Sequence, residues 1–241
     1  MRALALALLL AAAPAAAVAE APLKILRFQP DGPHPGAMKT YGYGASKIYI
    51  YDGAMNGPSA GAWSSPDLSS PMARWNFASY IKVLEGEVTF RPKSGPDMTF
   101  RPGESIFFPR GTEFSWFRTR DLKEYFVVFD FAPPGAPAPV ADPQVVRLDP
   151  AGPPRDIYKG PNGAAMRLWT TPPVTTPAAH VAANPELLVF LEGHVTLRTA
   201  SGQVERFGPG DVALTPRGLA YTWTSDAARL YRVVLDNPAP R

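Results

Sequence analysis

The stretch PGESIFFPRG, residues 102–111, returns later in the chain as PGDVALTPRG, residues 209–218. In both copies a Pro-Gly turn and an acidic residue precede a short strand-like run that ends at Pro-Arg-Gly. Outward from this stretch, Leu84-Glu85-Gly86 returns as Leu191-Glu192-Gly193, and Trp63-Ser64-Ser65-Pro66 returns as Trp169-Thr170-Thr171-Pro172. These matches keep a constant order and a spacing of 106 to 107 residues, so the chain is a tandem duplication.

Each copy has the pattern of short β-strands. Tyr80, Lys82 and Leu84 alternate with Ile81 and Val83, which places the two sets on opposite faces of one strand. Gly and Pro turns separate these runs about every ten residues, and the 29 prolines and 20 glycines of the chain leave almost no long helical pattern. The sequence therefore predicts an all-β protein built from two small barrels or sandwiches.

The repeats also divide the chain. Residues 1–19 combine Arg2, an apolar run and the small-residue pattern Ala17-Val18-Ala19, which predicts a cleavable signal peptide. Residues 20–131 then form the first barrel with a Pro- and Gly-rich leading segment, residues 132–143 a Pro-rich linker, and residues 144–241 the second barrel. We expect a periplasmic or secreted protein, and the absence of Cys means that it folds without disulfides.

The charge gives no support for a polyanionic partner. The chain has 24 Lys and Arg against 21 Asp and Glu, and removal of residues 1–19, with Arg2 and no acid, leaves 23 against 21, a charge of +2. No basic run interleaved with aromatic residues is present. We therefore expect no nucleic-acid partner and, once the signal peptide is cleaved, no membrane association.

The repeated motifs resemble those of a known family. Leu-Glu-Gly followed by Gly-Glu or Gly-Asp and Pro-Arg-Gly is similar to the signature stretches of the EutQ-like cupins, the group of the RmlC-like cupin superfamily that includes ureidoglycine aminohydrolase. Because both repeats carry the motifs, the resemblance is to a bicupin. It implies two tandem double-stranded β-helix (jelly-roll) barrels, each closed enough to enclose a pocket.

The same resemblance implies where a metal would sit. The cupin pattern has two histidines separated by one residue, a glutamate four positions later and a third histidine in the following motif. In the second repeat these positions hold His180, Ala182, Glu186 and Tyr221; in the first they hold Ala73 (or Arg74), Trp75, Ser79 and Phe114. The first barrel is therefore predicted to be metal-free and purely structural, and the second to hold a degenerate metal site.

Two functions follow for the second barrel. In the first, the protein binds a small molecule without catalysis, with Tyr221 and Trp223 on one strand face as a stacking wall for the ligand. In this case His180 and Glu186 form a hydrogen-bonded pair that lines the pocket, or His180 is displaced to a loop because Asn184 and Pro185 break the strand between the two residues. The tryptophans of the two repeats can equally serve as core packing.

In the alternative, His180 and Glu186 hold a divalent ion (Mn, Zn, Fe or Ni) and Tyr221 is the catalytic acid or base. The protein would then be a metal-dependent cupin enzyme, a hydrolase or isomerase similar to ureidoglycine aminohydrolase. A third possibility, beside the binding protein and the enzyme, is a structural homodimer whose barrels pack face to face.

Overall fold

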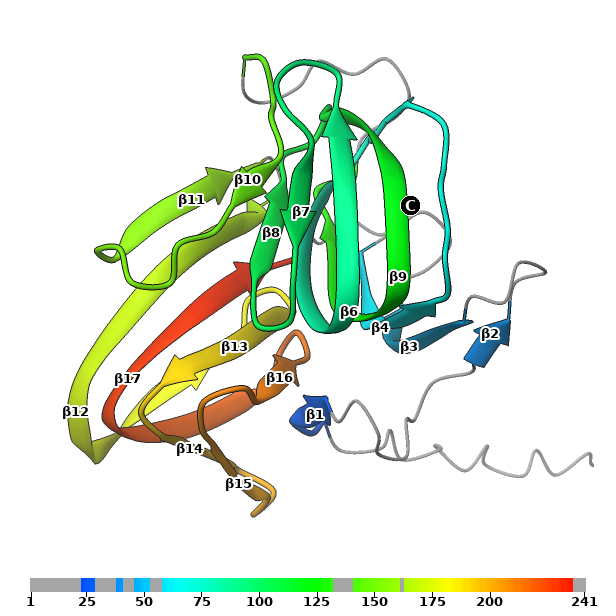
Figure 1. The fold of residues 1–241 in the computed structure, drawn as a ribbon. Helices are drawn as coiled ribbons and strands as arrows, with labels where there is room; N and C mark the ends of the chain where they lie inside the picture. Colours follow the sequence, from blue (N-terminus) through cyan, green and yellow to red (C-terminus); the bar gives the residue numbers. More distant parts are fainter. Residues whose placement is uncertain are drawn as a thin grey trace, which may run out of the picture.

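The computed structural model describes residues 23–28, 38–40, 46–52, 58–131, 141–160 and 163–235. The predicted signal peptide and most of the predicted linker lie outside these ranges. Within them the chain forms two curled antiparallel sheets, one per repeat (Figure 1). The first sheet contains β2 (Met38–Thr40), β3 (Ser46–Asp52), β4 (Ser59–Ser65), β5 (Ala73–Arg74), β6 (Ala78–Pro92), β7 (Met98–Phe100), β8 (Ser105–Phe108), β9 (Glu113–Phe129) and β10 (Val146–Arg147).

The second sheet repeats this plan. It contains β1 (Leu26–Phe28), β11 (Arg155–Lys159), β12 (Ala165–Val181), β13 (Glu186–Glu192), β14 (Val195–Thr199), β15 (Val204–Phe207), β16 (Val212–Thr215) and β17 (Ala220–Val234). β8 pairs with β6 and β6 with β9, as β16 pairs with β13 and β13 with β17. The prediction of an all-β chain with two tandem jelly-roll barrels is confirmed.

Strand alternation separates the apolar residues into different cores. On β6, Ile81 and Val83 point into the first barrel, whereas Tyr80 points out of it and is fully buried against the second. The interior of the second barrel is a separate cluster that includes Leu188 and Phe190. The largest cluster therefore lies between the barrels, because each barrel has an apolar outer face that needs the other as cover.

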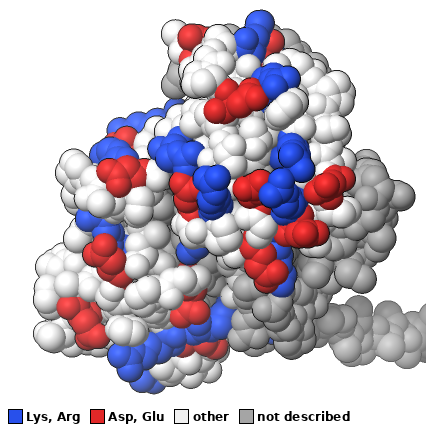
Figure 2. All heavy atoms as spheres, viewed as in Figure 1, with Lys and Arg blue, Asp and Glu red and all other residues white. Residues whose placement is uncertain are grey.

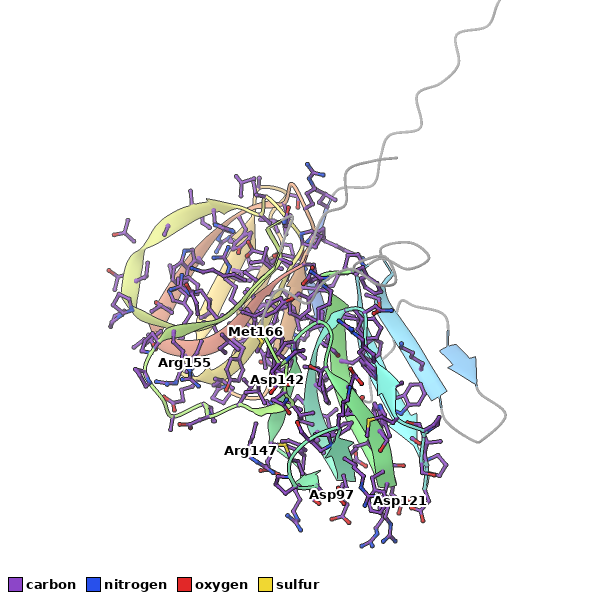
Figure 3. All side chains as sticks on the ribbon, turned by 90° about the horizontal axis from the view of Figure 1, so that it is seen from above. Asp97, Asp121, Asp142, Arg147, Arg155 and Met166 are labelled. Atoms are coloured by element: carbon purple, nitrogen blue, oxygen red, sulfur yellow. The ribbon has the colours of Figure 1, made fainter. Side chains whose placement is uncertain are left out.

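Aromatic and aliphatic side chains fill this junction. The rings of Tyr80 and Tyr231, one from each repeat, lie 5.9 Å apart. Phe107 and Tyr158 likewise meet across the junction, with ring centroids 5.2 Å apart. Figure 3 shows Met166, which is fully buried, where the two barrels meet. The barrels share this core, so we expect neither to be stable alone.

The two barrels also exchange short strands. β1, from the start of the chain, pairs with β16 of the second sheet, so that Leu26 lies opposite Leu214. β10, which follows the linker, pairs with β8 of the first sheet, so that Val146 lies opposite Phe107. Both edge strands β8 and β16 are thereby covered. The linker separates the repeats along the chain, but strand pairing crosses it in both directions.

The local backbone explains why each Leu-Glu-Gly motif ends in glycine. Gly86 and Gly193 both have φ of +67°, a conformation that other residues adopt with strain. A Cβ on Gly193 would lie 1.8 Å from the carbonyl oxygen of Ala227, and one on Gly86 would lie 2.2 Å from that of Arg120. The motif recurs because the chain at this glycine lies very close to a long strand in both barrels, β9 in the first and β17 in the second.

The surface in Figure 2 carries Lys and Arg interspersed with Asp and Glu, with no extended field of one sign on the face shown. Several opposite charges pair, as Arg91 does with Asp97 at 2.8 Å. No helix among the described residues is long and apolar enough to cross a membrane.

Candidate functional site

The second barrel encloses a cavity of about 280 Å³. Its lining consists mostly of apolar and aromatic residues, with a polar group at one end: Trp169, Ala179, His180, Glu186, Leu188, Phe190, Val195, Leu197, Tyr221, Trp223, Leu230 and Arg232. All four residues that the sequence singled out are in this set. The prediction that they face one cavity agrees with the structure, although their roles stay predictions.

His180 and Glu186 come from different strands. β12 ends at Val181, the chain turns through Asn184-Pro185, and β13 begins at Glu186. His180 lies opposite Tyr221 in the β12–β17 ladder. The corresponding pair in the first barrel is Ala73 opposite Phe114, which settles the alternative between Ala73 and Arg74.

The Glu186 carboxylate is the centre of the polar group. His180 Nε2 lies 3.3 Å from Oε1 of Glu186. The guanidinium of Arg232 forks around the same carboxylate, with Nη2 at 2.5 Å from Oε1 and Nε at 3.2 Å from Oε2. The Glu186 side chain is only 3% exposed, so this bidentate ion pair is what makes a buried carboxylate tolerable. The interpretation of His180 and Glu186 as a hydrogen-bonded pair agrees with this geometry.

Arg232 was missed in the sequence analysis. Partial burial lowers its pKa, but the hydrogen bonds and the charge of Glu186 outweigh this and raise the pKa overall. The repeat contained a signal, because Arg232 occupies the position of Phe126 in the first copy: Ile81 pairs with Phe126 as Leu188 pairs with Arg232. A cation that replaces an inward-facing aromatic residue indicates an acidic partner in the same barrel.

Tyr221 is buried beside this group. Its ring lies edge-on to His180, with 5.0 Å between the centroids. Burial, together with the charge of Glu186, raises the pKa of the Tyr221 phenol far above its ordinary value. The raised pKa favours the protonated phenol, which can donate a hydrogen bond.

The aromatic wall of the cavity contains two tryptophans. The rings of Trp169 and Trp223 lie 5.2 Å apart and are tilted by 49°. Both also pack against the barrel core, so the packing and lining roles of Trp223 coexist. Tyr221 is two residues from Trp223 on β17, as the stacking-wall prediction requires.

The first barrel, which the sequence predicts to be purely structural, is also hollow. It encloses a cavity of about 320 Å³, lined by Trp63, Trp75 and Trp116 among others. Ser79 stands where the second barrel has Glu186, since Ser79 pairs with Phe108 as Glu186 pairs with Thr215. The expectation rested only on the positions of the cupin metal ligands, and it stays a prediction. Other inward-facing positions of this barrel also carry polar groups, as described below.

A family model agrees with the duplicated motifs. The EutQ-like cupin domain matches residues 59–124 and again residues 166–232, more than half of the chain. The chain is a EutQ-like cupin. The two matched segments fall in the two barrels, so it is a bicupin of the RmlC-like superfamily.

Solved structures show the same fold. The cupin resembles a DUF861-family protein from Pseudomonas syringae pv. tomato at 17% identity and TM-score 0.64, over 88% of this chain and 100% of that one. It resembles protein Ylba from E. coli at 11% identity and TM-score 0.60, over 93% and 97% of the chains. A third similar structure is the bacterial pirin YhhW from E. coli in complex with nickel(II), at 13% identity and TM-score 0.51, over 89% and 100%. No curated protein matches the sequence.

The side chains at the cupin metal-ligand positions of the second barrel, in their present arrangement, do not fit a bound metal ion. Of the four ligand positions that the cupin pattern implies in the second barrel, only those of His180 and Glu186 carry good metal ligands, and catalytic zinc sites usually have three. Both carboxylate oxygens of Glu186 already accept hydrogen bonds from Arg232. Among the described residues, no group of three or more His, Cys, Asp or Glu side chains is placed to hold a metal ion.

Proposed function

We propose that this cupin is an exported protein that binds a small organic molecule in its second barrel. The proposal rests on the bidentate ion pair between Arg232 and Glu186 inside an otherwise apolar cavity. It neutralises the carboxylate that a metal would need and leaves N–H donors of Arg232 and His180 at one end of the cavity. Cavities with apolar walls and a few fixed polar groups are typical of small-molecule sites.

The polar end restricts the ligand. The side chains of Arg232 and His180 are 26% and 32% exposed, so both can be reached from the cavity. The N–H groups that Glu186 does not engage can donate a hydrogen bond only to an acceptor, such as a carbonyl or carboxylate oxygen. The ring wall of Trp169 and Trp223 favours a flat or apolar body. We therefore propose a ligand with an apolar or ring body and one acceptor group.

A thermal-shift screen against small carboxylates, ureides and sugars tests this proposal, because a ligand that binds only the folded state raises the melting temperature. Trp223→Leu should abolish the shift, and Arg232→Met should abolish it for ligands with an acceptor group. Trp116→Leu is the matched control in the first barrel, since Trp116 corresponds to Trp223. A shift that survives Trp223→Leu and is lost in Trp116→Leu would contradict the assignment to the second barrel.

The alternative function, a metal-dependent enzyme, is supported by the 3.3 Å contact of His180 with Glu186 and by the nickel bound to the structurally similar YhhW. Elemental analysis of protein purified without added metal decides between the two. We expect no stoichiometric metal in the wild type. Stoichiometric metal that disappears in His180→Ala would favour the enzyme instead.

Export is proposed from residues 1–19 alone. The mass of the protein recovered from the periplasm or medium after expression with its natural start should correspond to a chain that begins at Glu20. A full-length product in the cytoplasm would contradict export and would leave the binding proposal intact.

A further inference from the structure

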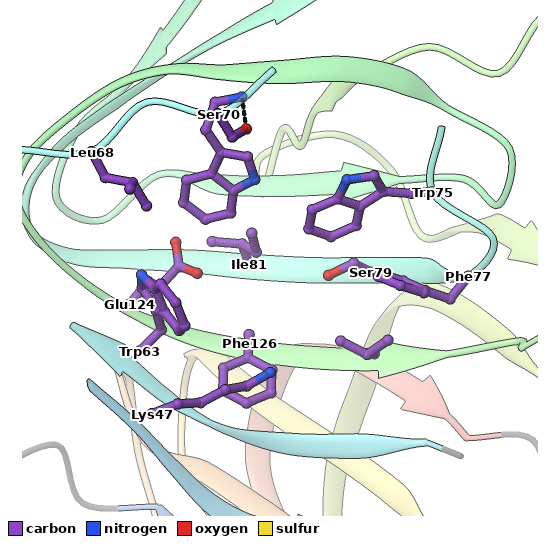
Figure 4. Close-up of a pocket in the computed structure, with 12 residues that line it drawn as sticks. Lys47, Trp63, Leu68, Ser70, Trp75, Phe77, Ser79, Ile81, Glu124 and Phe126 are labelled. Atoms are coloured by element: carbon purple, nitrogen blue, oxygen red, sulfur yellow. Dashed lines mark hydrogen bonds between the residues drawn. The ribbon is translucent and has the colours of Figure 1, made fainter. Parts of the chain in front are cut away.

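The cavity of the first barrel is built largely from aromatic side chains (Figure 4). Trp75 and Trp116 stack with 6.4 Å between ring centroids, and Trp63 lies 6.4 Å from Trp116 on the other side. Phe77 and Phe126 complete the aromatic lining. At about 320 Å³, the space is large enough for a ring compound of about ten heavy atoms.

One acidic side chain lies inside this apolar space. Glu124 on β9 is 2% exposed, and Figure 4 shows its carboxyl group directed into the cavity, toward Leu68 and Ile81. Its Oε2 atom is fully buried and has no hydrogen-bond partner among the described residues. A buried acceptor without a partner costs stability, so its presence indicates that something else supplies the partner.

Glu124 is not a remnant of the cupin metal site. The metal-ligand positions of this barrel are those of Ala73, Trp75, Ser79 and Phe114. Glu124 pairs with Val83 in the β6–β9 ladder, as Leu230 pairs with Phe190 in the β13–β17 ladder. The carboxyl group therefore stands where the other copy has a leucine, and it belongs to this barrel alone.

The charges around the cavity limit the kind of partner. Lys47, the cation among the lining residues, has its Nζ 4.3 Å from the centroid of the Phe126 ring. Its charge disfavours a cationic ligand in the same small space. Burial raises the pKa of Glu124 well above its ordinary value, although the charge of Lys47 acts in the opposite direction. In its protonated form, which burial favours, a carboxyl group offers both an O–H donor and a carbonyl acceptor.

We propose that the first barrel is a second binding site, which takes an uncharged and mainly apolar molecule whose amide-like edge pairs with the Glu124 carboxyl group. An amide edge presents an N–H donor beside a carbonyl acceptor, so it matches the carboxyl group with two hydrogen bonds. The N–H satisfies the partnerless oxygen, and the tryptophans cover the ring or chain that carries the amide. This proposal does not depend on the ligand or the function of the second barrel.

Three compounds of nearly one shape test the proposal: benzamide is neutral, benzylamine is cationic and benzoate is anionic at neutral pH. Binding to the purified protein is measured by titration calorimetry, and quenching of tryptophan fluorescence reports the contact with the ring wall. Benzamide should bind at least about tenfold more tightly than the two charged compounds, because each would place a charge in an apolar cavity.

Variants of the glutamate separate the chemistry from the shape. Glu124→Gln keeps one donor and one acceptor and should change the benzamide affinity by less than about threefold, whereas Glu124→Met removes both and should weaken it about 10- to 100-fold. Trp116→Leu should weaken benzamide binding and Trp223→Leu should leave it unchanged.

Several results would overturn the proposal. The first is no binding of benzamide to the wild type, and the second is equal binding to the wild type and Glu124→Met. If benzylamine bound more tightly than benzamide, the site would be one for organic cations. If benzoate bound more tightly than benzamide, the site would be one for anions that pair with Lys47. Loss of benzamide binding only in Trp223→Leu would place the compound in the second barrel.

Discussion

Methionine in place of each of the two buried glutamates, Glu124 and Glu186, is expected to change the stability of the protein in opposite directions. Glu124 leaves a buried oxygen without a partner among the described residues. Removal of such a group releases its desolvation cost, about 1 to 3 kcal/mol. Glu124→Met should therefore raise the free energy of unfolding by about that amount and the melting temperature by about 2 to 12 °C for a chain of this size.

Glu186 behaves differently because its carboxylate is satisfied. Glu186→Met removes the partner of Arg232 and leaves a guanidinium that is only partly exposed, at 26%. Breaking a fully buried pair costs about 3 to 5 kcal/mol, and partial exposure of Arg232 reduces this to about 2 to 3 kcal/mol. The melting temperature should fall by about 4 to 12 °C.

The gain in Glu124→Met should also depend on pH. In the unfolded chain Glu124 releases its proton near the ordinary value of 4.5, whereas burial holds the pKa of the folded state well above that value. Below pH 4.5 both states are protonated, and as the pH rises the wild type loses stability until the folded carboxyl group ionises. The advantage of the variant should therefore be smaller at pH 4 than at pH 7.

Urea unfolding followed by tryptophan fluorescence between pH 4 and pH 8 measures both effects. The reasoning would be refuted if Glu124→Met destabilised the protein at pH 7, since the carboxyl group would then contribute favourable contacts in the folded state. An equal change at pH 4 and pH 7 would contradict the raised pKa while leaving the missing partner in place.

Two further predictions concern the scaffold. Tyr158→Phe removes the phenol that donates a hydrogen bond to the buried Asp130 across the barrel junction. We expect the free energy of unfolding, measured by the same urea assay, to fall by about 1.5 to 3 kcal/mol. An unchanged urea midpoint would mean that this contact does not hold the barrels together. Gly193→Ala should cost more than about 1 kcal/mol because its Cβ would meet the Ala227 carbonyl at 1.8 Å, whereas Gly202→Ala, with nothing within 4 Å, should cost only the strain of its positive φ.

The fold could be predicted because its information is local and repeated. Leu-Glu-Gly and Pro-Arg-Gly mark positions whose backbone needs glycine, and alternation on β6 correctly placed Tyr80 and Ile81 on opposite faces. The strand predicted at Ser105–Phe108 is β8. Two copies of one pattern gave two barrels of one architecture.

The site was only partly predictable. His180, Glu186, Tyr221 and Trp223 were found because they occupy known positions relative to the motifs, and they do line one cavity. Arg232 was missed because its partner is 46 residues away in sequence. Glu124 was missed for a similar reason, since an acidic residue between Lys123 and Tyr125 on a long strand is equally compatible with a solvated face.

The sequence by itself therefore determined the duplication, the all-β architecture and which residues occupy the cupin metal-ligand positions in both copies. Only the tertiary structure decided that the barrels share a core and exchange the strands β1 and β10. It also decided that Arg110 is buried and lies 3.1 Å from Asp130, whereas Arg217, the equivalent residue of the second repeat, is exposed. The physical reason is that turns and alternation depend on neighbours in the chain, whereas burial and charge pairing depend on residues that only folding brings together.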